Sequence, residues 1–388
     1  MSRYPFLRLI LDGGSRLGIG LGQALIRRGV QMDRIRSVLY VSLLIFLLIS
    51  MGLPGNTLAQ SSKKIMIVHS YEKNHICGQP QHDGVIKALE DSGWHVGKNI
   101  KLSSYYMDTK RKNNTKALIS RQASVALQEI ERFDPDVVVT LDDNAFKTVA
   151  LPLSGKPVNI VFSGMNGQPE DYNKYSRFMQ NRSKPGGNIT GVYEKLHIRE
   201  AVQVLSTMHH IKKTLILCDQ SPTGKAIAKQ VELELRADRH TDPLPCAIAQ
   251  KTILSWEMFR QTINDINNSG EIGAFYLGAL LLRDASENTY TANEIIDYVV
   301  TNARKPAIGP NYAFIKLGLY GGASVDFFAM GKQAGKKVAQ ILAGASAGSL
   351  PIDDAQKVAL VFNLARSEAL GIEIPSDILL AADEVFRK

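Results

Sequence analysis

Residues 136–166 read DVVVTLDDNAFKTVALPLSGKPVNIVFSGMN and decide the fold that we predict for this chain. The segment 136–141 is a short β-branched run, and 157–162 is a second apolar run that follows a Gly/Pro turn. Both have the composition of buried strands. Each ends in small polar residues, at 142–144 and at 163–166. Because ligands of open parallel sheets bind beyond the carboxyl ends of the strands, the pattern predicts an α/β fold with a ligand site there.

Strands and helices alternate through the rest of the chain, which is typical of α/β proteins with parallel sheets. A polar loop at 166–187 separates two such series, so we expect two lobes with a cleft between their strand ends. The expected strands are 65–68, 101–106, 136–141, 157–162, 214–217, 246–249, 274–277, 306–308 and 358–361. The expected helices are 81–92, 114–132, 145–151, 197–209, 223–237, 256–267, 290–303, 327–341 and 377–386.

Two of these helices begin after side chains that can cap them. Asp142, Asp143 and Asn144 precede the helix at 145–151, and Asp326 precedes the helix at 327–341. Carboxylate and amide oxygens at these positions can accept hydrogen bonds from the free N–H groups of the first helical turn. We therefore expect N-caps at both places.

The composition excludes a disordered chain and a nucleic-acid-binding one. The chain has 388 residues, of which 45% are hydrophobic and 21% charged, as in globular proteins with room for two domains. Residues 1–59 carry seven arginines, no lysine and two aspartates, so they hold +5 of the formal net charge of +9. About +4 remains for the rest, without a basic stripe with interleaved aromatic residues. No nucleic-acid partner is expected.

Residues 38–53 form an apolar run of sixteen residues without a charge. Such a run suits the core of a signal peptide better than a spanning helix. Arg34 and Arg36 supply a positive flank, and the small residues before Gln60 make an acceptable cleavage site. We expect 1–59 to be a signal peptide with an upstream extension before Met32, and the mature protein to be periplasmic. A long native n-region and an uncleaved anchor are the alternatives.

The cysteines and histidines do not define a disulfide framework or a metal site. A bridge between Cys218 and Cys246 and two separate thiols both fit the predicted neighbouring strands. The cluster of His69, His75, Cys77 and His82 matches no standard zinc spacing, so a polar loop beside the cleft is favoured over metal ligation. No metal and no cofactor are predicted.

Motifs of catalysis are also missing from the sequence. There is no nucleophile elbow, Walker loop, C-x-x-C or H-E-x-x-H pattern, and the glycines of 13–22 follow no strand. Asp142 and Asp143 could act as paired catalytic carboxylates, but a helix cap and a cleft residue are the favoured interpretation. An exported α/β enzyme remains an alternative, and no catalytic residue is predicted.

The best candidates for function are the polar and aromatic residues at the predicted strand ends. Their hydroxyls, amides and nearby helix N–H groups could hold a polar head group, and the tyrosines could enclose a ring. Each alone is more often a cap or turn residue, but together they favour a ligand cleft. The candidates are Ser70, Tyr71, Thr140, Asp142, Asn144, Ser163, Asn166, Thr223, Tyr276 and Tyr312, with Asp219, Gly278 and Asn311 nearby.

Several segments resemble the exported solute-binding components of ABC transporters, in the family that includes tryptophan- and tyrosine-type binders. The segments are PGGNITGV at 185–192, GGASVDFFAMGKQAGKKVAQILAG at 321–344 and VALVFNLARSEALGIEIPSDILLAADEVF at 358–386. A second layer of likeness, in IVHSYEKN, YYMDTKR, LDDNA and VFSGMN, is to extracytoplasmic ligand-binding proteins, some linked to sensor kinases. Many relatives of that subgroup have a tryptophan shortly after the first strand, where this chain has His75-Ile76-Cys77.

The resemblance implies a two-lobed type I periplasmic-binding-protein fold with three crossovers and closure over a small ligand. The implied lobes are 60–187 plus about 310–345 and 188–309 plus about 346–388. Closure also needs a hinge, and we expect it at 188–191, where Asn188 begins the strand and Gly187 and Gly191 can absorb the dihedral changes. The positions that match the family's pocket are Ser70, Tyr71, Asp142, Asn144, Ser163, Asn166, Thr223 and Asp326.

The function expected from this resemblance is capture of a solute, weakly favouring an aromatic amino acid, for an ABC importer. The expected partner is an ABC permease, and the protein is expected to be a monomer. The alternative is a ligand-binding sensor component that partners a membrane histidine kinase.

Overall fold

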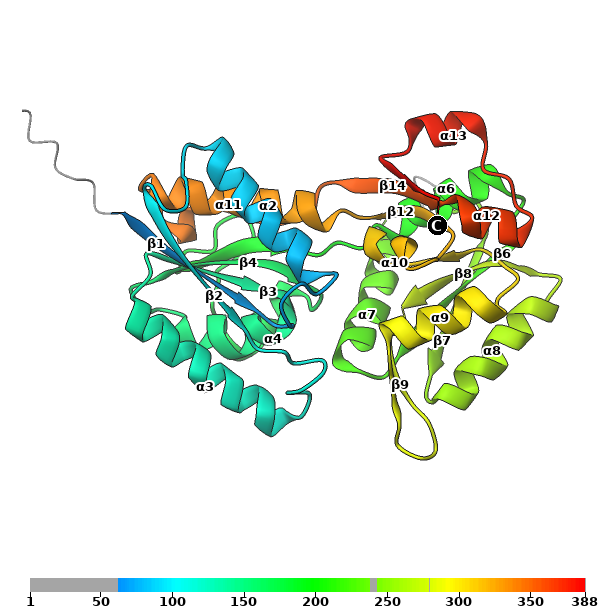
Figure 1. Cartoon of the computed structure of the whole chain (residues 1–388), viewed down its shortest axis with the longest axis horizontal. Helices are drawn as coiled ribbons and strands as arrows, with labels where there is room; N and C mark the ends of the chain where they lie inside the picture. Colours follow the sequence, from blue (N-terminus) through cyan, green and yellow to red (C-terminus); the bar gives the residue numbers. More distant parts are fainter. Residues whose placement is uncertain (1–61, 238–242, 279, 388) are drawn as a thin grey trace, which may run out of the picture. The chain divides into compact units, whose positions relative to one another are not determined.

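The computed structural model describes residues 62–237, 243–278 and 280–387. The predicted signal peptide and start site lie outside the described residues. Within the part that the structure describes, no helix has both the length and the apolar character needed to cross a bilayer. The described residues belong to one compact unit, and its helices flank the sheets of two lobes (Figure 1).

The first lobe is built on a parallel sheet of six strands. In spatial order they are β13 (Ile352–Asp354), β5 (Ile189–Tyr193), β4 (Asn159–Met165), β3 (Val137–Leu141), β1 (Lys63–His69) and β2 (Ile100–Tyr106). The register pairs His69 with Leu141 and Leu141 with Ser163. The carboxyl ends of three neighbouring strands are therefore level, as the sequence pattern of β3 and β4 predicts.

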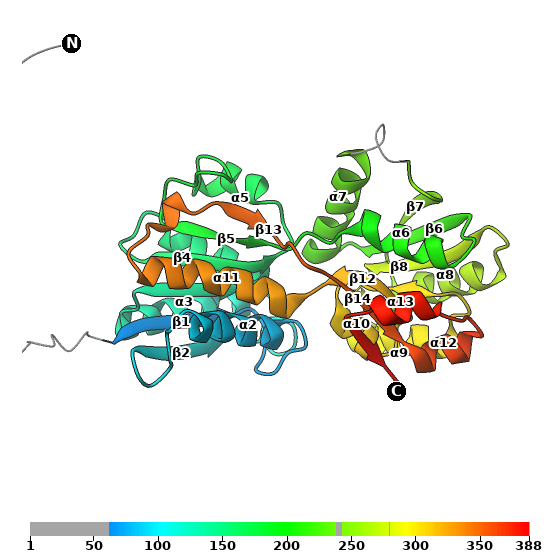
Figure 2. The same ribbon diagram turned by 90° about the horizontal axis from the view of Figure 1, so that it is seen from above.

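Helices cover both faces of this sheet. They are α2 (Gly78–Asp91), α3 (Lys116–Phe133), the single turn α4 (Asp142–Ala145), α5 (Pro169–Ser176) and α11 (Phe327–Leu342). Figures 1 and 2 show α2 and α11 side by side. Glycines allow this close approach, since a Cβ on Gly331 would lie 2.1 Å from the Gln81 carbonyl oxygen, and one on Gly84 2.2 Å from that of Phe328. The contact fixes Gln81, whose side chain reaches the strand ends.

The second lobe has a parallel sheet of four strands and a smaller mixed one. The first contains, in order, β11 (Ala307–Ile308), β8 (Ile272–Gly278), β6 (Lys213–Asp219) and β7 (Ala247–Ile253). The second contains β12 (Gly321–Val325), β14 (Val358–Asn363) and β15 (Glu384–Phe386), and β9 (Leu281–Arg283) and β10 (Thr289–Thr291) form a hairpin. The helices are α6 (Ile198–Met208), α7 (Pro222–Ala237), α8 (Trp256–Asn268), α9 (Ala292–Asn302), α10 (Tyr312–Lys316), α12 (Leu364–Leu370) and α13 (Ser376–Ala381).

The chain passes between the lobes three times: after β5, between β12 and α11, and between β13 and β14 (Figure 2). These crossings are tied to one another. His197 of the first crossing binds the Ala355 carbonyl of the third at 2.8 Å, and Lys357 of the third pairs with Asp326 of the second at 3.1 Å.

The observed lobe limits differ from the expected ones. The strand after Asn188 was expected to open the second lobe, but β5 pairs with β4 on one side and β13 on the other. Its five residues are all buried, because they lie inside the first sheet. Similarly, β12 belongs to the second lobe and only the following α11 to the first.

Most predicted elements are confirmed, but three local predictions are wrong. The helix expected at 145–151 is a helical turn followed by the π-helical turn Phe146–Ala150 and the 3-10 turn Leu151–Leu153. The last helix ends at Ala381 rather than 386, because Asp383 accepts the N–H of Leu360 at 2.9 Å and draws β15 into a sheet beside β14. Asp142, Asp143 and Asn144 do not cap the turn that they begin.

The three cysteines are free thiols, so Cys218 and Cys246 form no bridge.

Candidate functional site

Ser70, at the end of β1, supplies the cap that Asp142 to Asn144 were expected to provide. Its hydroxyl donates to the Leu141 carbonyl oxygen at 2.7 Å and accepts from the Ala145 N–H at 2.8 Å. The serine therefore joins two neighbouring strand ends. This leaves the carboxylate of Asp142 available for other contacts.

Asp142 is buried in a left-handed backbone conformation at the end of β3. Its φ is 66° and only 3% of its surface is exposed. Non-glycine residues adopt this conformation at a cost, and such residues concentrate at functional sites. Burial raises the pKa of the carboxyl to about 8, the nearby Lys110 opposes the shift, and the charge of Asp143 adds to it.

Asp143 has a different role from its neighbour. Its carboxylate accepts the N–H groups of Asn166 and Gly167 at 3.1 and 3.2 Å, together with the hydroxyl of Tyr172. It thus fixes the loop after β4. The two aspartates do not share one environment, and only Asp142 keeps an unused oxygen.

Glu194 was missed by the sequence analysis and lies directly after β5. It is 3% exposed, and its carboxylate accepts from the Asn166 side-chain amide at 2.8 Å. Burial raises its pKa well above the usual range, and the charges of Asp142 and Asp143 act in the same direction. The signal that could have found it is the same one that marks Asp142, a polar residue directly after a buried strand.

Gln81, on helix α2, links that helix to the ends of β3 and β4. Its amide oxygen accepts from the Ser163 hydroxyl at 2.8 Å, its amide nitrogen donates to the Cys77 carbonyl at 3.2 Å, and its side chain also hydrogen-bonds Asp142. Gly164 is needed here, because a Cβ at this residue would lie 2.6 Å from the Gln81 amide oxygen.

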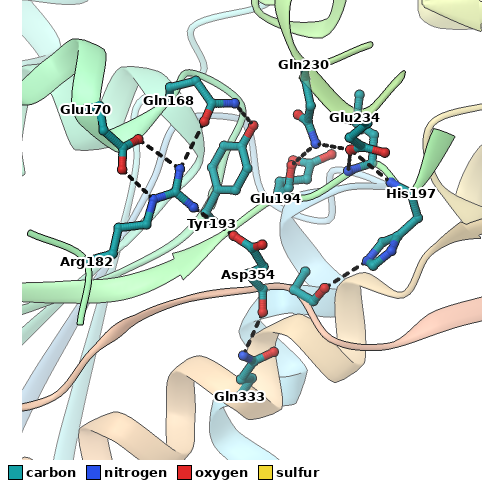
Figure 3. A network of polar contacts seen from close by, with 12 residues as sticks. Gln168, Glu170, Arg182, Tyr193, Glu194, His197, Gln230, Glu234, Gln333 and Asp354 are labelled. Carbon is teal, nitrogen blue, oxygen red and sulfur yellow. Dashed lines mark hydrogen bonds and ion pairs between the residues drawn. The ribbon is translucent and has the colours of Figure 1, made fainter. Parts of the chain in front are cut away.

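The second lobe contributes side chains to the same place. The amide nitrogen of Gln230, on α7, donates to the Glu194 carbonyl at 3.1 Å and to the Glu234 carboxylate at 2.9 Å (Figure 3). The amide of Asn311 points at the sulfur of Cys77, 3.9 Å away. Tyr276, at the end of β8, is fully buried, and its pKa is raised by burial and by the charges of Glu234 and Glu194.

We call this group the strand-end cluster. It consists of Tyr71, Cys77, Asp142, Glu194, Gln230, Tyr276 and Asn311.

Four polar atoms of the strand-end cluster are buried without a hydrogen-bond partner. They are Asp142 Oδ2 from the first lobe and Gln230 Oε1, Tyr276 OH and Asn311 Oδ1 from the second. Burying an unpaired polar atom costs about 1–3 kcal/mol, and native proteins pair nearly all of them. Four such atoms gathered from two lobes indicate a site for a polar ligand.

Tyr71 forms an aromatic wall of the cluster. Its ring contacts that of His75 with centroids 4.3 Å apart, and the Lys110 ammonium lies 4.4 Å from the ring centroid. A cation in this position is attracted by the face of the ring. Lys110 is therefore held near the two buried carboxylates.

The other predicted site residues lie outside the strand-end cluster. Ser163 and Asn166 support the cluster through Gln81 and Glu194, as described. Thr140 is buried within β3 with its hydroxyl unpaired. Asn144 donates to the Thr109 hydroxyl at 2.9 Å, and Thr223 is half-buried in the first turn of α7.

Two predicted residues lie at or near the second crossing. Asp326 caps α11 by accepting the Ala329 N–H at 2.8 Å, as predicted, and also pairs with Lys357. Tyr312 is half-buried at the start of α10, and burial, with the charge of Asp326 next, raises its pKa to about 12.

The predicted hinge residues lie in and just before β5. The side-chain amide of Asn188 donates to the Leu153 and Val158 carbonyls at 2.9 and 2.7 Å. A Cβ on Gly191 would lie 2.4 Å from the ring of Phe162, so this glycine permits close packing within the sheet.

A hollow of about 210 Å³ lies beside the crossings, and Gln230 of the strand-end cluster is part of its wall. Arg182 on its wall pairs with Glu170 and Asp354 at 2.7 and 2.8 Å and stacks over Tyr193, whose ring centroid is 4.9 Å away (Figure 3). Arg182 and its acidic neighbours are thus already paired with one another. We therefore do not assign the ligand to it.

His69, the last residue of β1, and His82 of α2 stack on each other. His69 Nε2 lies 3.0 Å from His82 Nδ1, and the His69 ring stacks on Tyr106 at 4.3 Å. Burial lowers the pKa of His69 to about 3. Among the residues described, no group of three or more histidine, cysteine, aspartate or glutamate side chains could hold a metal ion.

Comparison with known proteins gives a family match and several structural neighbours. Residues 74–386 match the family model described as ABC transporter substrate binding protein. The chain is 21% identical to a tyrosine-binding protein of Clostridioides difficile over 292 residues, which cover 75% of this chain and 76% of the relative.

Two solved structures share the fold. One is an ABC domain in complex with L-Trp from Streptococcus pneumonia, with a TM-score of 0.62, 17% identity, and coverage of 84% of this chain and 100% of that one. The other is a conserved domain protein of Vibrio cholerae O1 biovar eltor, with a TM-score of 0.63, 20% identity and the same coverage. The predicted two-lobed, type I periplasmic-binding-protein fold is confirmed.

Proposed function

Because the chain belongs to the family of ABC transporter substrate-binding proteins, we propose that it captures a small solute at the strand-end cluster and delivers it to an ABC permease. Members of this family bind substrates, and the proposed action is reversible capture rather than turnover. The observation that carries the proposal is the set of four unpaired, buried polar atoms contributed by both lobes. A solute that pairs them removes a free-energy cost of about 1–3 kcal/mol for each.

Closure of the two lobes explains how capture and release would alternate. The contacts from Gln230 to Glu194 and from Asn311 to Cys77 join the lobes at the cluster, and Lys229 pairs with Asp171 beside it. A solute among these residues touches both lobes only when they are together, so its binding favours the closed state. Opening about the three crossings would then release it.

Aromatic amino acids are the first ligands to test. One relative is named a tyrosine-binding protein, and one structural neighbour is a complex with L-Trp. In this chain Tyr71 and Tyr276 supply rings beside the polar atoms, which suits a solute with an aromatic part. We further propose that the run 38–53 directs export and that the protein works in the periplasm as a monomer.

A thermal-shift screen of amino acids, purines and sugars on the purified protein tests the proposal. A ligand at a hundred times its Kd stabilises the folded state by about 2.7 kcal/mol, which gives a clear rise in Tm. The variants Asp142→Ala and Tyr71→Ala should abolish that rise, whereas Asp265→Ala, at an exposed site on α8, should retain it. If no solute shifts the Tm, or if both cluster variants respond normally, the proposed function or its site is refuted.

A further inference from the structure

The cluster's unpaired atoms specify which part of a solute would enter. We propose that the solute presents a protonated nitrogen, bound between the carboxylates of Asp142 and Glu194, and that this group rather than a carboxylate determines recognition. The inference rests on the proposed capture function and names the chemical class of its substrate.

The charges around the two carboxylates are predominantly negative. Asp142 and Glu194 act on each other, Asp143 acts on both, and Lys110 is the cation that acts on both. The neighbouring Arg111 is paired with Glu72 and Asp108 at 3.4 and 3.3 Å. Buried charges are normally paired, and these carboxylates exceed the cations around them. A cationic solute would supply the missing charge.

The side-chain amides of Gln230 and Asn311 have their nitrogens bonded within the protein and their oxygens left for a solute. The nitrogen of Gln230 is directed at two oxygens, those of the Glu194 carbonyl and the Glu234 carboxylate, which fixes the orientation of the amide. The nitrogen of Asn311 faces the Cys77 sulfur. In both residues the oxygen is left without a donor, as is Asp142 Oδ2. Amide and carboxylate oxygens accept hydrogen bonds, so these three atoms need donors, which the N–H groups of a solute can supply; the fourth unpaired atom, the Tyr276 hydroxyl, can donate or accept.

An ammonium group or a protonated ring nitrogen meets both requirements. It carries positive charge and several N–H donors, and hydrogen bonds between ionised partners are stronger than neutral ones. An anion at the same place would face Asp142 and Glu194. A solute carboxylate has Lys110 as its available partner, but this side chain is only half-buried and lies over Tyr71.

Proton release on binding is a consequence that can be measured. In the empty protein burial raises the pKa values of Asp142 and Glu194, so part of their protons remain bound at neutral pH. A bound cation favours the ionised carboxylates and lowers those pKa values. Affinity should therefore rise with pH up to about 8, the pKa of Asp142, while the amine stays protonated. Glu234 adjoins the pair, and burial raises its pKa too, so its carboxyl titrates in the same direction. Burial raises the pKa values of Tyr71, Cys77 and Tyr276 above their ordinary alkaline values, so these groups keep their protons in this range. Asp143 and Lys110 are the other charged groups that act on the pair.

The experiment uses three probes with one ring. L-tyrosine has both charged groups, tyramine lacks the carboxylate, and 3-(4-hydroxyphenyl)propanoate lacks the ammonium. A second set with an indole ring repeats the comparison with L-tryptophan, tryptamine and indole-3-propanoate, in the same order. Titration calorimetry on the purified protein should show that the amine probes bind within about tenfold of the amino acids, and that the acid probes bind at least a hundredfold more weakly. Titrations in two buffers of different ionisation enthalpy should show protons released near neutral pH.

Matched variants separate recognition from folding. Asp142→Asn and Glu194→Gln keep the shape and remove the charge, and each should weaken binding of the amine probes at least tenfold and reduce proton release. Asp265→Asn and Glu271→Gln, at exposed positions, should change neither. A variant that melts at or above the wild-type Tm shows that lost binding is not lost folding.

The outcomes distinguish this inference from the proposed function. Tight binding of the acid probes without the amine probes overturns the cation inference and leaves solute capture standing. The same holds if the wider screen finds only neutral or anionic solutes. If no solute of any class binds, both proposals fail.

Discussion

Replacing Asp142 by Asn should make the ligand-free protein more stable, and the gain should depend on pH. The pKa of this buried carboxyl is raised from 3.8 to about 8 in the folded protein. Between these values the folded state retains a proton that the unfolded state has lost. Stability therefore falls as pH rises, by about 1.4 kcal/mol per pH unit for one group. The loss begins near pH 4 and is complete above about pH 8.

The magnitude at pH 7 follows from the same shift. About three of the four units lie below pH 7, so burial of this carboxyl, which keeps its proton in the folded protein, costs on the order of 4 kcal/mol there. Asn carries no charge, and it keeps a group for the hydrogen bond with Gln81. We expect Asp142→Asn to recover about 2–4 kcal/mol at pH 7, more at pH 8, and about 1 kcal/mol at pH 5.

Urea unfolding at pH 5, 7 and 8 measures this effect. The protein has two tryptophans, Trp94 in the first lobe and Trp256 in the second, where Trp256 stacks on Tyr290 at 4.1 Å, so fluorescence reports on both lobes. Asp265→Asn is the matched control and should leave the free energy of unfolding unchanged at every pH. An Asp142→Asn variant that is less stable than the wild type at pH 8, or that shows an equal dependence on pH, would refute the assignment of a costly buried carboxylate.

Three further substitutions test the supports of the site, each by urea unfolding with a binding titration. Gly331→Ala places a Cβ 2.1 Å from the Gln81 carbonyl oxygen, so α2 must move. This should lower the free energy of unfolding by about 1–3 kcal/mol and weaken ligand binding. An unaltered stability would contradict the close contact between α2 and α11. Ser70→Ala removes the bond to the Leu141 carbonyl and the acceptor of the Ala145 N–H, and should cost about 1–3 kcal/mol. Its effect should exceed that of Ser124→Ala on the exposed face of α3, and equal losses would refute the capping role. Arg366→Met removes a buried guanidinium that donates to the Val300 and Ala303 carbonyls at 2.7 and 2.8 Å. It should cost about 2–4 kcal/mol without changing ligand affinity, and a change in Kd would contradict the separation of these contacts from the site.

The sequence predicts the order and type of most elements because those depend on short-range patterns. The β-branched run of β3 and the apolar spacing of α11 are local periodicities, and a buried strand and an amphipathic helix form where they occur. The polar residues after β3 and β4 likewise indicate the edge of the sheet that bears Asp142, Ser163 and Asn166. Where long-range pairing overrides local preference, the prediction fails. The end of the chain has helical spacing, but β14 offers an unpaired edge to residues 384–386, which join it as a strand.

Which polar residues meet at the site could be decided only by the tertiary structure. Glu194, Gln230 and Asn311 are far apart in the sequence, and each is an ordinary residue after a strand or on a helix. They come together because the chain crosses three times between the sheets, so that strand ends of both lobes face the same point. Asp326 stands in the same kind of sequence pattern, yet it caps α11 and pairs with Lys357. Local sequence thus determines that strands end in polar side chains. The crossings and the sheet register determine which of those side chains are left buried without a partner. The reason is that burial and pairing depend on neighbours that lie far away in the sequence.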